Sequence, residues 1–155
     1  MKKVYIAGPD VFRPDAVEHG RRCKAVCAEY GLIGLYPFDN EADTAEEIFK
    51  GNCALIDECD IVCANLNPFR GDEPDSGTCF ELGYGHAKGK ALYGYLEDTR
   101  SLRQKLGEAD AQGNSVEDFD LPVNLMMGIP ARIVKGDFSA CIKAIAAKTG
   151  KGNNV

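Results

Sequence analysis

Residues 60–87, which read DIVCANLNPFRGDEPDSGTCFELGYGHA, contain a predicted strand, a predicted loop and a predicted helix in direct succession. Residues 60–66 form a short apolar run, which is typical of a strand buried in a sheet. Two prolines and a glycine interrupt residues 67–74, so we expect a loop there. Asp75 is a residue type that favours the beginning of a helix, which we predict over residues 76–88. A strand followed by a helix is the repeating unit of a parallel α/β sheet.

The rest of the chain continues this alternation of short apolar runs and stretches with helical spacing. Five strands separated by helices predict a single α/β domain with a doubly wound, five-stranded parallel sheet that is covered on both faces. We place this domain at residues 1–149 and a polar carboxyl-terminal tail at residues 150–155. The other expected strands are residues 3–7, 32–36, 90–95 and 132–135; the other expected helices are residues 15–30, 44–59, 98–106 and 138–148, with a helical turn in 121–127.

The charge balance excludes some partners. A formal net charge of -6 and an isoelectric point near 4.9 argue against a nucleic-acid polymer as the ligand, and no cluster of lysine and arginine suggests a groove for a phosphate backbone. An acidic surface is compatible with a neutral small molecule such as a nucleoside. No apolar stretch approaches the length of a membrane span, and the first apolar run ends at Gly8, too early for a signal peptide. We therefore expect a soluble, cytoplasmic protein without a membrane partner.

Seven cysteines form an odd set without the CxxC spacing of common zinc sites, and the chain has only two histidines. This pattern favours reduced, packed thiols in an intracellular protein over a metal centre or a disulfide framework. We expect no metal.

The loops that follow the strands are the places to look for a site, because ligands of parallel sheets bind beyond the carboxyl ends of the strands. Gly8, Phe12, Asp39 and Asn40 follow the first two strands, and Glu81 lies early in the helix after the third. The positive end of the helix dipole favours an ionised carboxylate there, and such a group can attack the anomeric carbon of a sugar. A solvated glutamate that merely complements the dipole is the alternative.

Five stretches of the sequence together resemble the nucleoside 2-deoxyribosyltransferase family. They are YIAGP at residues 5–9, PFDN at 37–40, CDIV at 59–62, DSGTCFELGYGHA at 75–87 and VNLM at 123–126. The resemblance covers nearly the whole chain in the right order, and the stretch at 75–87 is the most specific part. It implies a flavodoxin-like fold, the transfer of a 2-deoxyribosyl group between the nucleobases of 2′-deoxynucleosides, and no cofactor.

The resemblance implies roles for four catalytic residues. Glu81 is the nucleophile that forms a covalent deoxyribosyl intermediate, and Tyr5 orients it. Asp60, near the base, is the general acid, and Asp75 assists at the base or holds the 5′-hydroxyl of the sugar. Judged from the residues alone, Asp60 is equally a solvated residue at the start of a strand, Asp75 a helix cap and Tyr5 a core aromatic.

The resemblance also implies a substrate-binding set in the loops after the first two strands. Gly8 belongs to it, and Phe12 would stack on the base unless it packs on its own protein. Asp39 and Asn40 would line the base pocket unless they only make the turn after Pro37.

Asn124 and Met126 correspond to residues that a neighbouring subunit contributes in the family, where they complete the sugar pocket. The resemblance therefore implies a homo-oligomer of at least two subunits. The alternative for residues 121–127 is an ordinary buried turn.

Two other functions remain open from the sequence. A 2′-deoxynucleoside 5′-monophosphate N-glycosidase would use water in place of a second base and would also bind a phosphate. The chain offers candidate phosphate ligands at Arg13, Arg70, Ser76 and Thr78. Asp75 would repel a phosphate, so we favour an unphosphorylated substrate. A non-enzymatic nucleotide-sensing module is disfavoured, because a phospho-accepting aspartate would end the third strand and Asp60 starts it.

Overall fold

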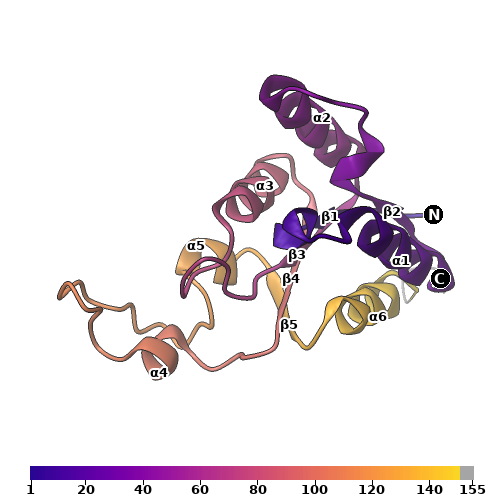
Figure 1. Cartoon of the computed structure of the whole chain (residues 1–155). Coiled ribbons are helices and arrows are strands. Elements are labelled where there is room, and N and C mark those ends of the chain that lie inside the picture. The colour runs from indigo at the N-terminus through magenta and orange to yellow at the C-terminus, as the bar shows by residue number, and fades with distance from the viewer. Residues whose placement is uncertain (151–155) are drawn as a thin grey trace.

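The computed structural model describes residues 1–150 and has one five-stranded sheet at its centre (Figure 1). All neighbouring strands are parallel, in the order β2-β1-β3-β4-β5. With helices on both faces, this order makes the protein a single flavodoxin-like α/β domain, as the sequence predicted. Apart from Gly150, the predicted tail lies outside the described residues. The strands are β1 (Lys3–Ala7), β2 (Ile33–Leu35), β3 (Ile61–Asn65), β4 (Ala91–Leu96) and β5 (Arg132–Lys135).

The helices form a layer on each face of the sheet (Figure 1). One layer contains α1 (Ala16–Glu29) and α6 (Phe138–Thr149), and the other contains α2 (Ala45–Glu58), α3 (Ser76–Ala87) and the short α5 (Leu125–Gly128). The short helix α4 (Leu102–Leu106) and the loop after it extend away from the sheet (Figure 1). Within residues 1–150, no helix has both the length and the apolar composition needed to cross a membrane.

The two layers follow from the alternation of side chains along each strand. In β1, Val4 and Ile6 pack against α1 and α6, whereas Tyr5 and Ala7 point to the opposite face. That face receives Leu82 of α3, which is 1% exposed. The ring of Tyr5 therefore lies in the core beneath α2 and α3, the helices that follow β2 and β3 in the chain.

The predicted element limits agree with the structure within two residues, except in the segment before β5. Helix α4 begins four residues later than predicted because Ser101 caps it. Ser101 Oγ accepts a hydrogen bond from Gln104 N at 3.2 Å, and the Gln104 side chain accepts one from Ser101 N at 3.0 Å. Two 3-10 turns that the sequence analysis did not predict, η1 (Pro9–Phe12) and η2 (Pro37–Asp39), follow β1 and β2.

Candidate active site

Glu81 lies in the second turn of α3, where its carboxyl group is largely buried. The pKa of this carboxyl is raised to about 7: burial is the main cause, the Tyr5 hydroxyl opposes it, and the Asp75 carboxylate adds to it. The helix dipole acts mainly on the first turn of a helix, so at this depth burial outweighs it. Burial therefore offsets the effect of the dipole, which the sequence led us to expect to favour an ionised carboxylate, and moves the ionisation of Glu81 toward neutral pH.

The hydroxyl of Tyr5 is the neighbour of this carboxyl in the core. Burial and then the charge of Glu81 raise the pKa of the Tyr5 hydroxyl far above its ordinary value, so it remains a proton donor. The Tyr5 hydroxyl acts on the Glu81 carboxyl as a hydrogen-bond donor, but the geometry of this contact is loose, and Tyr5 Oη and Glu81 Oε2 are buried without another partner among residues 1–150. Buried polar atoms nearly always have partners, so this pair marks a place where polar groups of a ligand would gain hydrogen bonds.

Asp75 is the N-cap of α3 and lies close enough to Glu81 for its charge to act there. Its Oδ2 accepts hydrogen bonds from Thr78 N at 2.9 Å and from Thr78 Oγ1 at 2.8 Å. A pocket of about 390 Å³ opens beside Asp75 and Ser76. Asp75 therefore both caps α3 and lies near Glu81.

Two asparagines bring further unpaired polar atoms to the same side of the sheet. Asn52 of α2 lies one turn before Ile56, which is fully buried in the cluster that contains Tyr5, so both residues lie on the helix face toward the sheet. Asn40 packs on α2, since a Cβ atom added to Gly51 would lie 2.6 Å from Asn40 Nδ2. Asn52 Oδ1 and Asn40 Nδ2 are buried without a partner among residues 1–150. Asn52 is not among the site residues predicted from the sequence, although its spacing from Ile56 is a usable signal.

Asp60 lies at the opposite edge of the sheet, before the first residue of β3. Its Oδ1 pairs with Lys2 Nζ at 2.7 Å, and its Oδ2 accepts a hydrogen bond from Lys3 N at 2.8 Å. These bonds, that of Lys2 first, hold the pKa of Asp60 below its usual value. The structure does not bring Asp60 to Glu81, and we do not retain the sequence-based assignment of Asp60 as the general acid.

Asp39 makes the turn that follows β2. Its Oδ2 accepts a hydrogen bond from Tyr36 N at 2.9 Å, and its Oδ1 forms an ion pair with Lys24. Because both carboxylate oxygens of Asp39 have partners, the interpretation of Asp39 as a turn-forming residue fits the structure. Of the predicted pair Asp39 and Asn40, it is Asn40 whose side chain has a buried polar atom.

Gly8 and Phe12 border the carboxyl ends of β1 and β3. A Cβ atom on Gly8 would lie 2.7 Å from Asp10 Oδ2 and 2.9 Å from Asn65 Cβ, so this contact requires glycine. Asn65 Nδ2 donates to Asp10 Oδ2 at 2.9 Å, which ties the two strand ends together. Phe12 is 57% exposed and stacks on Phe69 with ring centroids 5.5 Å apart, so the protein already covers one face of its ring.

Asn124 and Met126 lie at the beginning of α5. Asn124 caps this helix, with its Oδ1 accepting from Met126 N at 3.0 Å and its Nδ2 donating to Glu117 Oε1 at 2.8 Å. Met126 is 76% exposed. Neither side chain is hydrogen-bonded to Glu81 or Tyr5 of its own chain.

The seven cysteines are free thiols, and residues 1–150 contain no group of three or more His, Cys, Asp and Glu side chains that could hold a metal ion. The candidate site is thus composed of carboxyl, amide and phenol groups, which can act as nucleophile, proton donor and hydrogen-bond partners.

The model of a protein family described as nucleoside 2-deoxyribosyltransferase matches residues 4–126. The chain belongs to this nucleoside 2-deoxyribosyltransferase family. The match includes Tyr5, Asn52, Asp75 and Glu81, and it confirms the resemblance found in the sequence.

Solved structures support the same assignment. The chain is similar to a 2-desoxiribosyltransferase from Leishmania mexicana, with 40% identity, a TM-score of 0.87, and coverage of 95% of this chain and 98% of that one. A conserved protein from Enterococcus faecalis V583 (19% identity, TM-score 0.62) and a CMP N-glycosidase from Clostridium botulinum (18% identity, TM-score 0.52) share the fold; each match covers 94% of this chain and 99% of the other.

A curated relative is an uncharacterised protein from Schizosaccharomyces pombe, which is 38% identical over an alignment of 113 residues; the match covers 66% of this chain. The chain spans about half of that relative, since the match covers 54% of its length.

Proposed function

We propose that the protein transfers a 2-deoxyribosyl group from one nucleobase to another, with Glu81 as the nucleophile. The observation that carries this proposal is the buried carboxyl of Glu81 beside the Tyr5 hydroxyl and the Asp75 carboxylate. It occurs in a chain 40% identical to a 2-desoxiribosyltransferase. A carboxylate shielded from water attacks a sugar carbon more readily than a hydrated one does.

The reaction has two displacements at C1′ of the sugar. In the first, an ionised Glu81 oxygen bonds to C1′ while the bond from C1′ to the base nitrogen breaks, and the departing base takes up a proton. In the second, a nitrogen of another base attacks C1′, releases Glu81 and loses its proton. Two inversions give overall retention, as in retaining glycosidases. The sugar lacks a 2′-hydroxyl, so its oxocarbenium-like transition state forms more readily than that of a ribonucleoside.

We propose that Asp75, in place of Asp60, assists at the departing base through its second carboxylate oxygen, which is a hydrogen-bond acceptor. Its charge acts on Glu81, and one of its oxygens is already fixed by Thr78, which orients the other. Asn52 Oδ1 and Asn40 Nδ2 are buried without partners among residues 1–150, and together they present an acceptor and a donor of the kind that pairs with the edge of a nucleobase. We propose that they hold the base.

The surroundings of Asp75 favour an unphosphorylated substrate over a nucleoside monophosphate. The pocket beside Ser76 contains the three carboxylates of Asp72, Glu73 and Asp75 and a single cation, Arg70. Three negative charges would repel a 5′-phosphate at this position. This charge balance supports the transferase over the glycosidase alternative.

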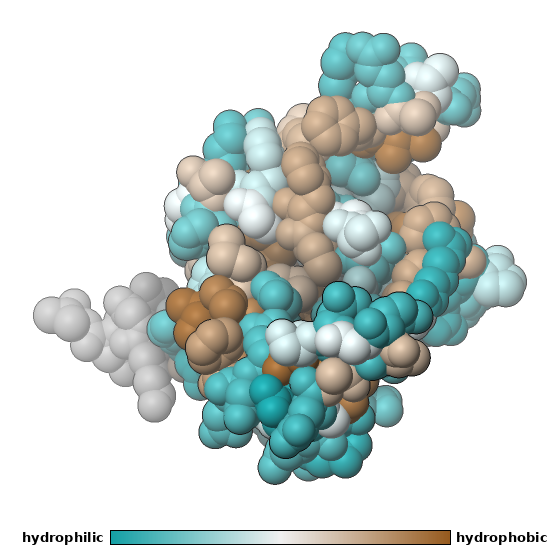
Figure 2. Space-filling model, turned by 90° about the vertical axis from the view of Figure 1, so that its left-hand side faces the viewer, coloured by the Kyte–Doolittle hydropathy of each residue, from teal (hydrophilic) through white to brown (hydrophobic). Residues whose placement is uncertain are grey.

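We infer further that a second copy of the chain covers the α2, α3 and α5 side and contributes Met126 and Asn124 to the site. Met126 and Ile129 are 76% and 73% exposed, and Phe49 and Phe80 leave more than half of their surfaces exposed. Figure 2 shows hydrophobic residues as a band between hydrophilic regions on the side of the molecule that faces left in Figure 1. Exposed apolar surface of this kind marks interaction sites. Light scattering should give a mass of at least twice the 16.8 kDa chain.

The transfer reaction is tested with deoxyinosine and free adenine. We expect equal amounts of hypoxanthine and deoxyadenosine, separated by chromatography. Glu81→Ala should lower the rate by about a thousandfold or more, because the covalent route is lost. Glu46→Ala, which removes an exposed carboxylate from α2, is the matched control and should retain near-normal exchange.

Mass spectrometry of the protein mixed with deoxyinosine alone should show a deoxyribosyl adduct on Glu81. Release of hypoxanthine and free deoxyribose with no exchange into adenine would instead identify a hydrolase. Normal exchange by Glu81→Ala would reject Glu81 as the nucleophile.

A further inference from the structure

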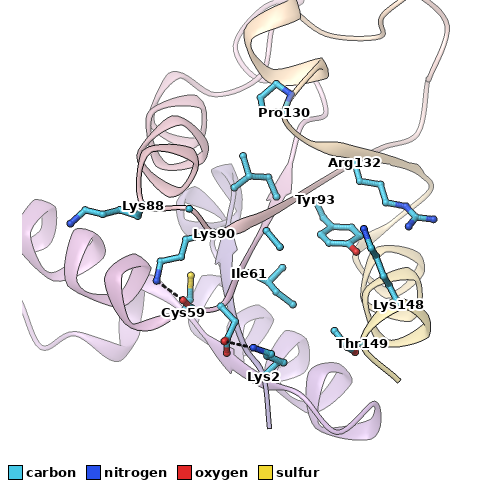
Figure 3. A pocket seen from close by; sticks show the side chains of 14 residues that line it. Lys2, Cys59, Ile61, Lys88, Lys90, Tyr93, Pro130, Arg132, Lys148 and Thr149 are labelled. Carbon is cyan, nitrogen blue, oxygen red and sulfur yellow. Dashed lines mark hydrogen bonds and ion pairs between the residues drawn. The ribbon is translucent and has the colours of Figure 1, made fainter. Parts of the chain in front are cut away.

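A second cleft lies at the edge of the sheet opposite to Asp75, where the parallel strands begin (Figure 3). Its volume is about 680 Å³, within the usual range of small-molecule sites. The amino ends of β3, β4 and β5 form its floor, and the carboxyl ends of α3 and α6 form its sides. The reaction proposed for Glu81 does not use this cleft.

The cleft is basic, although the chain as a whole carries a formal net charge of -6. Among residues 1–150, Asp60 is the one carboxylate in its lining. The cations of its lining are Lys2, Lys88, Lys90, Arg132 and Lys148. A local charge opposite in sign to that of the whole protein raises the local concentration of anions.

Three of these cations are already paired within the protein. Lys2 pairs with Asp60 at 2.7 Å, and Lys88 pairs with Asp57 at 2.9 Å. Lys90 Nζ donates to the carbonyl oxygens of Asp57 and Cys59 at 2.7 Å each, at the carboxyl end of α2. These pairs leave two cations for a ligand.

Those two are Arg132 and Lys148, which have no ion pair or side-chain hydrogen bond within residues 1–150. Arg132 comes from β5 and Lys148 from α6, and their charged ends approach each other above Tyr93 (Figure 3). The hydroxyl of Tyr93 points into the same part of the cleft (Figure 3). Two like charges that face each other raise the free energy of the fold, and an anion between them would lower it.

We propose that this cleft binds a phosphate-bearing small molecule of nucleotide size. The guanidinium of Arg132 presents paired donors that match two phosphate oxygens, Lys148 adds a point charge, and the Tyr93 hydroxyl adds a neutral donor. Ile61, Leu92 and Tyr93 form the apolar floor of the cleft; they are 4%, 6% and 4% exposed, so the body of such a ligand would contact only the small parts of these side chains that reach the floor. A single carboxylate, with one negative charge, would leave part of this donor set unused.

Isothermal titration calorimetry on the full chain tests the proposal with adenosine 5′-monophosphate and, separately, with inorganic phosphate. We expect a dissociation constant for the nucleotide below about 1 mM, weaker binding of phosphate alone, and weakening of both by added salt. Equal affinities for the two probes would restrict the proposal to an inorganic phosphate site and overturn its nucleotide part.

Arg132→Gln and Lys148→Met should each weaken nucleotide binding about tenfold or more, because each removes a charged hydrogen-bond donor. Lys135→Met on β5 and Lys143→Met on α6 are matched controls, since each removes one exposed cation from the same element. Base exchange should stay unchanged in all four variants. The proposal fails if no heat is detected up to about 10 mM of either probe. It also fails if the control variants weaken binding as much as Arg132→Gln does, which would indicate only diffuse charge attraction.

Discussion

The hydroxyl of Tyr5 on β1 and the carboxyl of Glu81 on α3 control each other's ionisation inside the core. The charge of Glu81 contributes to the raised pKa of Tyr5, and the Tyr5 hydroxyl counteracts the burial that raises the pKa of Glu81. The strand and the helix come from distant parts of the sequence, so the fold creates this pair. Its consequence is that the ionisation of Glu81, which we propose as the nucleophile, changes near neutral pH.

The pH dependence of base exchange should report this pair. A nucleophile must be ionised, and the pKa of Glu81 is about 7, so kcat/KM should fall as the pH falls through 7. In Tyr5→Phe the opposing influence of the hydroxyl is lost, and the midpoint should move up by about one pH unit. Measurements of kcat/KM from about pH 5 to 9 test both statements.

Tyr36→Phe is the control for this comparison. Tyr36 is also buried with an unpaired hydroxyl, but it belongs to the cluster on the other face of the sheet. Its loss should leave the midpoint in place. An acid midpoint near pH 4.5 in the unchanged protein would contradict the raised pKa of Glu81.

Glu81→Gln should stabilise the fold in a pH-dependent way. The carboxyl has a pKa of about 7 in the folded protein against 4.5 in the unfolded chain, so the folded state binds its proton more tightly. The resulting destabilisation is absent below pH 4.5, grows between 4.5 and 7, and is complete above 7. Removing the charge should therefore raise the free energy of unfolding by about 3 kcal/mol more at high pH than at low pH.

Urea denaturation at about pH 4 and pH 8 measures this difference. Glu46→Gln removes an exposed carboxylate from α2 and should change stability by less than about 1 kcal/mol at either pH. A stability gain in Glu81→Gln that is the same at both pH values would show that the carboxyl is not destabilised by burial.

Substitution of Asn52 should lower kcat/KM more than substitution of Asp60, although the sequence assigned a catalytic role to Asp60 and none to Asn52. Asn52 carries a buried, unpaired oxygen on the helix face toward Tyr5, so Asn52→Ala should lower kcat/KM about 10- to 100-fold. Asp60 pairs with Lys2 at the opposite edge of the sheet, so Asp60→Asn should leave kcat/KM within about twofold. Steady-state kinetics on the two variants, with circular dichroism to confirm folding, decide between the two residues. A large loss of activity in Asp60→Asn alone would restore the original assignment.

The position of Asp60 shows what the sequence can and cannot determine. Alternating apolar runs predicted all five strands and their parallel arrangement, because strand and helix periodicity are local properties. The chain direction also tells at which end of a strand a residue lies. Asp60 precedes β3 and so lies at its amino end, whereas ligands bind beyond the carboxyl ends of parallel strands. This information was present in the sequence, but the resemblance outweighed it.

The ionisation of Glu81 could not be predicted in the same way. It depends on how deeply α3 packs on β1 and on the distance to Tyr5, both of which are tertiary properties. Asn52 is an intermediate case. Its position four residues before Ile56 was visible in the sequence, but the depth at which its side chain is buried was not.

Gly8 should tolerate no side chain, because the carboxyl ends of β1 and β3 approach each other there. A Cβ atom in Gly8→Ala would lie 2.7 Å from Asp10 Oδ2 and 2.9 Å from Asn65 Cβ, closer than such atoms approach in folded proteins. The loops must move apart, which should cost about 1–3 kcal/mol of stability and shift the residues that border the site.

Gly83→Ala is the matched control for this change. Gly83 lies on the exposed side of α3, and a Cβ atom there would meet nothing within 4 Å. Alanine is a better helix former than glycine, so this variant should gain up to about 1 kcal/mol of stability. Thermal unfolding and kcat/KM of both variants test the comparison. If Gly8→Ala were as stable and as active as the unchanged protein, the contact between the two strand ends would have no role in shaping the site.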